Sequence, residues 1–111
     1  MPDAAAAFES THCIEPDLPA FEGHFPASPL LPGAYLLALV VHEAECQPAL
    51  RTRLEPTLQV QQVKFLAPVR PGDTLLVRLE AQPAGVAFSV HHGATLVARG
   101  QLGAMPLAAP P

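Results

Sequence analysis

The sequence predicts an α+β domain in which an antiparallel β-sheet wraps around one central apolar helix. Two patterns indicate this architecture. Residues 34–41 are apolar at every position, which is typical of a helix with protein on most sides. After Pro56 the hydrophobic period changes to two, and short alternating segments are separated by turns containing glycine or proline, as in antiparallel strands. A lone apolar helix beside such strands is covered only if the sheet curls around it.

The composition indicates one domain, residues 1–111, that associates with another chain. A length of 111 residues supports one modest core. Because 50% of the residues are hydrophobic and only 14% are charged, the polar surface is thin for a monomer, and we expect a second copy to cover apolar surface. Alternatively, the many alanines and a solvated tail raise the hydrophobic count. Residues 1–9 are expected to be either a flexible end or part of an edge strand, and residues 104–111 are expected to be a flexible end.

Charge and cysteine content exclude several classes of protein. The net charge of −4 and the six scattered basic residues argue against nucleic acid as a partner, which requires a clustered basic face. The longest apolar run is far shorter than the roughly 20 residues of a membrane span. The N-terminal sequence MPDAAAAFES lacks the basic residues of a secretory signal. Cys13 and Cys46 have no metal-type spacing. We therefore expect a cytoplasmic protein with reduced thiols, no metal and no other cofactor.

The first half of the chain is expected to contain an edge strand and the helix. Residues 10–18 have β-forming content, and Pro16 suits an edge strand. His12 and Cys13 lie there, on opposite faces, so they are not expected to share a metal. The helix should begin near Pro32–Gly33, where proline is tolerated, and end before Pro48. Residues 46–56 are interpreted as a polar connection on the surface.

The second half is expected to contain four strands. In residues 57–69, Leu58 and Val60 share one face, whereas Val63 and Phe65 have the opposite parity. One extra residue at Gln61–Gln62 would restore a single inward face, so we predict a β-bulge there. The later strands are expected at 75–81, with Leu75, Val77 and Leu79 inward, at 86–92 and at 94–103, with turns at 69–74, 83–85 and His92–Gly93. The segment from Met105 onward is expected to be disordered.

One histidine stands in a proline-rich loop directly before the helix. The loop FEGHFPASPLLPG contains His24 and leads through Pro29 and Pro32 into the helix. Because proline fixes the backbone, such a loop can hold an imidazole rigidly at the start of a buried helix. We interpret His24 as a functional residue. The structural alternative is a loop histidine that hydrogen-bonds its own turn.

Two sequence blocks resemble those of the hotdog-fold 3-hydroxyacyl-acyl carrier protein dehydratases. The first block is GHFP followed by a proline and by PG at the helix start, and the second contains KF, PV and PGD. The first loop is most similar to that of small stand-alone relatives associated with aryl-polyene and similar pigment lipids. The matching positions are Gly23, His24, Phe25, Pro26, Pro29, Pro32, Gly33, Lys64, Phe65, Pro68, Val69, Pro71, Gly72 and Asp73.

The resemblance implies a dimer with an acyl tunnel between the subunits and no cofactor. His24 would be the general base that removes the α-carbon proton of a thioester substrate, since imidazole exchanges protons near neutral pH. The backbone N–H of Gly33, at the helix start, would stabilise the enolate oxygen. Phe25, Pro32 and Phe65 are expected to line the tunnel.

The sequence departs from the family pattern at the second catalytic group. Family members carry a carboxylate on the helix, contributed from the other subunit, and Ala38 occupies that position here. Tyr35 and His42, three and four residues away on the same helical face, can reach the vacant space. The structural alternatives are that Tyr35 is a packing aromatic and that His42 is a helix-end histidine favoured by the helix dipole. Otherwise a paralogous chain donates the carboxylate in a hetero-oligomer, or the site is inactive or altered in chemistry. Glu43 is rotated by roughly 140° from Ala38 and is a poor substitute.

Three hypotheses for the function follow from the resemblance. The first is a 3-hydroxyacyl thioester dehydratase in fatty-acid or related lipid and polyene biosynthesis, with the acyl group on acyl carrier protein or coenzyme A. The second is a thioesterase on the same fold. The third is a catalytically degenerate acyl-binding or partner subunit, which Ala38 would explain directly. Histidines 91 and 92 are expected at a hairpin end. Lys64, Arg70 and Arg99 either meet an acidic carrier protein or are solvated surface charges.

Overall fold

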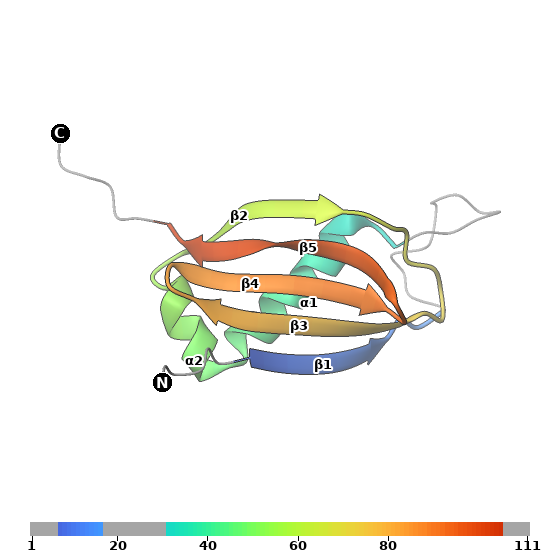
Figure 1. Ribbon diagram of the computed structural model, residues 1–111, viewed down its shortest axis with the longest axis horizontal. Coiled ribbons are helices and arrows are strands. Elements are labelled where there is room, and N and C mark those ends of the chain that lie inside the picture. Colours follow the sequence, from blue (N-terminus) through green and yellow to red (C-terminus); the bar gives the residue numbers. More distant parts are fainter. Residues whose placement is uncertain (1–6, 17–30, 106–111) are drawn as a thin grey trace.

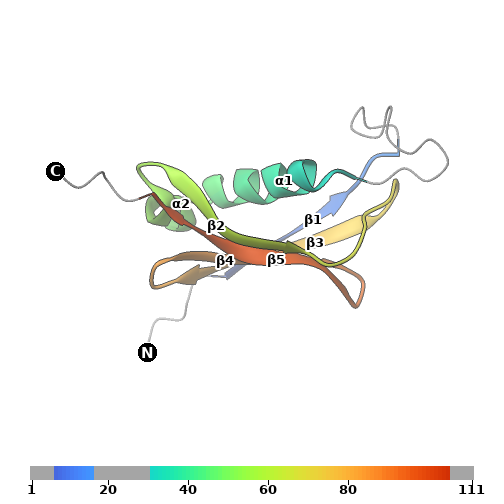
Figure 2. The ribbon, with the colours of Figure 1, turned by 90° about the horizontal axis from the view of Figure 1, so that it is seen from above.

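The computed structural model describes residues 7–16 and 31–105, which form one twisted antiparallel sheet with α1 and α2 on the same side of it (Figures 1 and 2). The predicted order of one strand, one long helix and four further strands is confirmed. In chain order the elements are β1 (Ala7–Cys13), α1 (Gly33–Glu45), α2 (Pro48–Arg51), the 3₁₀ helix η2 (Thr52–Leu54), β2 (Leu58–Phe65), β3 (Thr74–Gln82), β4 (Gly85–His92) and β5 (Thr95–Ala104).

The sheet has the strand order β1-β3-β4-β5-β2, with every neighbouring pair antiparallel. The last three strands form consecutive hairpins, and Gly93 adopts φ 60° in the turn after β4, a conformation that glycine reaches without steric cost. Strands β1 and β2 are the two edges, so the prediction of an edge position for the first strand is confirmed. Figure 1 shows α1 crossing behind the sheet.

The core lies between α1 and the inner face of the sheet. Leu36, Val40 and Ala44 of α1 are buried, as are Leu50 and Leu54 of the following short helices. The predicted inward positions of β3 are confirmed, since Leu75, Val77 and Leu79 are at most 2% exposed. The predicted bulge in β2 is also confirmed: the pairing of β2 with β5 shifts register between Val60 and Gln62.

The ends of the first strand differ from the prediction. Strand β1 spans Ala7–Cys13 rather than 10–18, because Phe8 packs against the core and pairs with Leu79 of β3. The strand ends before Pro16, which cannot donate a backbone hydrogen bond. Residues 7–9 belong to β1, in agreement with the edge-strand alternative, whereas Ala104 is the last residue of β5 and not part of a flexible end. Residues 1–6, 17–18 and 106–111 lie outside the described residues.

The connection 46–56 was predicted to be a polar surface segment; most of it is exposed, but two buried leucines and two short helices were not predicted. It contains α2 and η2, and Leu50 and Leu54 are 0% and 3% exposed. Pro48 occupies the first turn of α2, where a missing N–H is tolerated. The two leucines four residues apart share one helical face, and that spacing was the signal in the sequence.

Gly100 of β5 permits close packing against the backbone of β2 and the ring of Phe88. A Cβ atom at this position would lie 2.1 Å from the backbone oxygen of Gln62 and 2.6 Å from Cζ of Phe88, which is 4% exposed. Neither group can retreat without disturbing a strand or the core. We expect Gly100→Ala to lower the free energy of unfolding by about 1–3 kcal/mol. Urea denaturation measures this change.

The neighbouring variant Gln101→Ala is the matched control for Gly100→Ala. Gln101 lies on the same strand, is partly exposed and lines the outer face of the sheet. Its replacement is expected to change the free energy of unfolding by no more than about 0.5 kcal/mol. Equal stability of the two variants would show that the sheet yields at Gly100 more easily than its contacts indicate.

Candidate active site at the start of helix α1

Helix α1 begins, next to an apolar pocket, with backbone donors that have no backbone partner among residues 7–16 and 31–105. Pro32 is extended (φ −60°, ψ 142°), and its carbonyl oxygen accepts from the N–H groups of Tyr35 and Leu36 at 3.0 and 3.3 Å. The preceding N–H groups, of Gly33 and Ala34, have no acceptor within the helix, as at every helix start. They lie at the positive end of the helix dipole and can donate to a developing negative oxygen.

A pocket of about 430 Å³ lies beside this helix start. Its walls are almost wholly apolar, as suits an acyl chain. The backbone N–H of Leu31 donates to the oxygen of Val69 at 2.8 Å, which ties the helix entrance to the segment after β2. The lining residues are Leu31, Gly33, Leu36, Phe65, Leu66, Ala67, Pro68 and Val69. Gly33 and Phe65 of this set were predicted from the sequence, whereas the wall from Leu66 to Val69 was not.

Gly33 and Phe65 lie in contact in the structure. A Cβ atom at position 33 would lie 2.9 Å from Cζ of Phe65, so glycine allows the ring to approach the helix start closely. The Phe65 side chain is 49% exposed. Pro32 directly precedes the helix start in this region. His24 and Phe25 lie outside the described residues, and their roles stay predictions.

One face of α1 is uncovered in the single chain. Tyr35, Ala38 and His42 are exposed along this face, whereas Leu36, Val40 and Ala44 are buried on the other side. The expectation that the helix has protein on most sides is therefore not met within one chain. This is the face on which the family resemblance places a carboxylate, and the three residues are spaced so that their side chains are neighbours.

Glu43 points away from that face. Its Oε2 lies 3.7 Å from Nε2 of His12 on β1, and the same nitrogen is 2.9 Å from Oγ of Ser10. Both contacts involve one ring nitrogen, so this trio is not a relay of acid, base and nucleophile, which would need both nitrogens. Glu43 is thus occupied at β1, in agreement with its expected failure to replace a carboxylate at position 38.

The cysteines and the remaining histidines were further candidates for metal or proton chemistry. Among residues 7–16 and 31–105, no three histidine, cysteine or acidic side chains are grouped as in a metal site, and Cys13 and Cys46 are free and exposed. Within the same ranges no helix is long and apolar enough to cross a bilayer. His91 and His92 end β4 at a hairpin, as predicted. Nε2 of His92 is 3.7 Å from the Asp73 carboxylate.

A curled antiparallel sheet around one long helix is the hotdog fold, which the similar solved structures share. Residues 2–101 match the family model described as ApeI-like, ApeI dehydratase. The chain therefore belongs to the ApeI-like dehydratase family.

Two solved structures and one curated relative illustrate the similarity. The dehydratase heterocomplex ApeI:P from Xenorhabdus doucetiae is 28% identical with a TM-score of 0.71, over 90% of this chain and 88% of that chain. An uncharacterized protein from Erwinia carotovora subsp. atroseptica is 30% identical with a TM-score of 0.74, over 96% and 89%. The 3-hydroxyacyl-acyl-carrier-protein dehydratase FabZ of Nitratiruptor sp. is 36% identical over 56% of this chain and 49% of its own length. The chain thus spans about half of that curated relative.

Proposed function

We propose that this protein dehydrates 3-hydroxyacyl thioesters to 2-enoyl thioesters, with the acyl group on an acyl carrier protein or coenzyme A. The observation that carries the proposal is that Gly33, the first residue of α1, lines an apolar pocket in a chain of the ApeI-like dehydratase family. The pathway would be fatty-acid or related lipid and polyene biosynthesis, in the cytoplasm.

The proposed reaction requires a base, an oxyanion donor and an acid. The thioester carbonyl oxygen accepts from the Gly33 N–H, and the acyl chain enters the pocket beside Phe65. His24 removes a proton from the α-carbon, and the electron pair moves onto the carbonyl oxygen as an enolate. The enolate then collapses, the bond from the β-carbon to the hydroxyl group breaks, and an acid donates the proton with which this group leaves as water.

The acid can come from either of two sources, a second copy of this chain or a paralogous chain. Ala38 cannot donate a proton, whereas Tyr35 and His42 are exposed on the same helical face and can do so from one copy to another. Alternatively, a paralogous chain brings a carboxylate against the exposed face of α1. The solved relative named as a heterocomplex supports this second arrangement.

The exposed surface supports an oligomer of either kind. Strand β2 is an open edge whose backbone groups can pair with another strand, and large apolar side chains gather on and near it. Phe65 and Leu66 are 49% and 51% exposed, values that a partner chain would lower. Within residues 7–16 and 31–105, the other large exposed apolar residues are Tyr35, Val60 and Met105.

A direct assay tests the proposal. The purified protein is incubated with a 3-hydroxyacyl thioester, and the 2-enoyl thioester is followed by its near-ultraviolet absorbance. The assay is run on the protein alone and mixed with a paralogue that carries the helix carboxylate. Enoyl formation in either sample supports the proposal. Release of free thiol without enoyl product would indicate the thioesterase alternative, and neither product would indicate an acyl-binding subunit.

Gly33→Ala tests the role of the helix start. The added methyl group would meet the Phe65 ring at 2.9 Å, within the space where the substrate carbonyl is proposed to lie. We expect kcat/KM to fall by about 10²-fold, because small displacements of a reacting group have effects of that size. Stability should change little, since the exposed ring can move and alanine suits a helix. The double variant Gly33→Ala/Phe65→Leu should recover activity, because it removes the ring that the added methyl group meets. If activity does not recover, contact with Phe65 is not the cause of the loss.

A further inference from the structure

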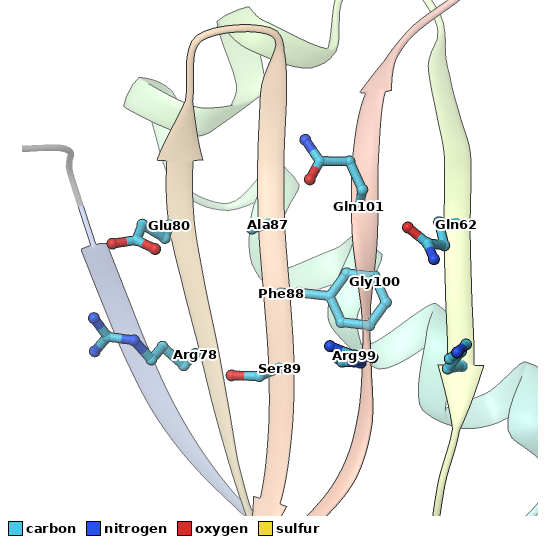
Figure 3. A pocket seen from close by; sticks show the side chains of 10 residues that line it. Gln62, Arg78, Glu80, Ala87, Phe88, Ser89, Arg99, Gly100 and Gln101 are labelled. Atoms are coloured by element: carbon cyan, nitrogen blue, oxygen red, sulfur yellow. The ribbon is translucent and has the colours of Figure 1, made fainter.

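The outer face of the sheet, away from α1, carries a second hollow. Figure 3 shows this face with the helices behind the sheet. The hollow has a volume of about 360 Å³ and runs along β4, where Ala87 and Ser89 are short. Longer side chains border it on both sides, from β3 on one side and from β5 and β2 on the other. They are Arg78, Glu80, Arg99, Gln101, Gln62 and Lys64.

Strand register aligns the cations of this hollow in one row. Arg78 pairs with Ser89, Ser89 with Arg99, and Arg99 with Lys64, across four neighbouring strands. The row contains three of the six basic residues of a chain whose net charge is −4. The sequence alone could not reveal this grouping, because residues 64, 78 and 99 are far apart along the chain.

Two of these cations lack a carboxylate partner within the part of the chain that the structure describes. Arg78 is paired with Glu9 at 2.9 Å. Lys64 and Arg99 stand directly opposite each other on β2 and β5, and none of the described carboxylates lies within 4.0 Å of either. Like charges at directly opposite positions of an antiparallel pair are unfavourable. An anion between the two side chains would remove this repulsion.

We propose that this hollow binds the phosphate group of a hydroxyl-bearing organic phosphate. Arg99 offers a planar fork that matches phosphate oxygens, Lys64 adds a second positive charge, and the Ser89 hydroxyl lies between Arg99 and Arg78. Nε2 of His91 is 3.2 Å from Oγ of Ser89 and helps to orient that hydroxyl.

A second row of side chains crosses the same strands next to the cationic row and fits the organic part of such a ligand. It contains Glu80, Gln101 and Gln62, which are neutral or acidic and can exchange hydrogen bonds with hydroxyl groups. Glu80 lies one row away from Arg99, so a phosphate is favoured at the cationic row and disfavoured beside Glu80. The charge gradient fixes the direction in which the ligand lies.

This hollow is separate from the candidate active site. Lys64 and Phe65 are consecutive residues of β2, and consecutive residues of a strand point to opposite faces. Phe65 lines the pocket beside Gly33, whereas Lys64 lines the outer hollow. Phosphate binding and dehydration can therefore be measured and lost independently.

Isothermal titration of the full chain with ribose 5-phosphate tests the inference, with inorganic phosphate and ribose as comparison probes. We expect saturable binding of ribose 5-phosphate, and Arg99→Gln and Lys64→Gln should each weaken it about tenfold. Arg51→Gln, an exposed arginine on α2, should leave it unchanged. Tighter binding of the sugar phosphate than of inorganic phosphate supports an organic ligand, and equal binding supports recognition of the phosphate group alone.

Two results would overturn the inference: absence of saturable binding of both phosphate probes, or equal binding by all the variants. Because Lys64 and Arg99 are exposed, their replacement should leave the fold intact, which circular dichroism checks. The dehydration assay is run on the same variants. A sample that binds phosphate but forms no enoyl product would contradict the proposed function and leave this inference standing.

Discussion

Replacing His24 by alanine is expected to reduce dehydration by at least about 10²–10⁴-fold, the usual contribution of one general acid or base. His42, on the exposed face of α1, is a candidate for the acid rather than the base, and two other histidines are engaged elsewhere. His12 is engaged with Ser10 and Glu43 at β1, and His91 lies beside Ser89 at the outer face. The measurement is the rate of 2-enoyl thioester formation at saturating substrate, in whichever sample, the protein alone or mixed with a paralogue, shows the activity.

His91→Ala is the control for His24→Ala. It removes an imidazole that contacts Ser89, a residue lining the outer hollow of the sheet, and dehydration should persist. The His24 variant should retain native circular dichroism and still bind a 3-hydroxyacyl thioester. If His24→Ala turns over at close to the native rate, His24 is not the base. The pocket beside Gly33 would then be assigned a binding role only.

The fold was predictable because each level of the sequence points to the same structure. The period-two pattern gave the inner positions of β3, and the change of parity between Val60 and Val63 gave the bulge. The errors have local causes. Phe8 follows a run of alanines that has no strand pattern, so the start of β1 at Ala7 was not predicted. Prolines near both ends of 46–56 favoured a loop, so the helical spacing of Leu50 and Leu54 was overlooked.

The candidate site was predictable only where chemistry and local sequence coincide. Pro32 and Gly33 identify a helix start, and a helix start implies free N–H donors. The wall formed by residues 66–69 was missed because it depends on a long-range contact, the hydrogen bond from Leu31 to Val69. The exposed face of α1 was expected only through the family resemblance, because an apolar sequence by itself does not distinguish burial in one chain from burial between two chains.

Introducing a carboxylate at position 38 tests whether the acid that the family resemblance places there is the missing catalytic group. Ala38 is exposed on the uncovered face of α1, so Ala38→Glu adds a good helix former without displacing a buried group. If the native homo-oligomer lacks only the acid, the variant should gain dehydration by about 10²–10⁴-fold. The rate of 2-enoyl thioester formation by the protein alone measures the gain.

Ala38→Gln is the matched control, since glutamine has nearly the same shape but cannot transfer a proton. A gain in the glutamate variant alone identifies proton transfer as the missing function and indicates that the native chain obtains its acid from a partner. A native protein that already turns over at full rate on its own contradicts this reading. In that case His42→Ala and Tyr35→Phe identify the donor, because both side chains share the exposed face with Ala38 and only the true donor is needed for turnover.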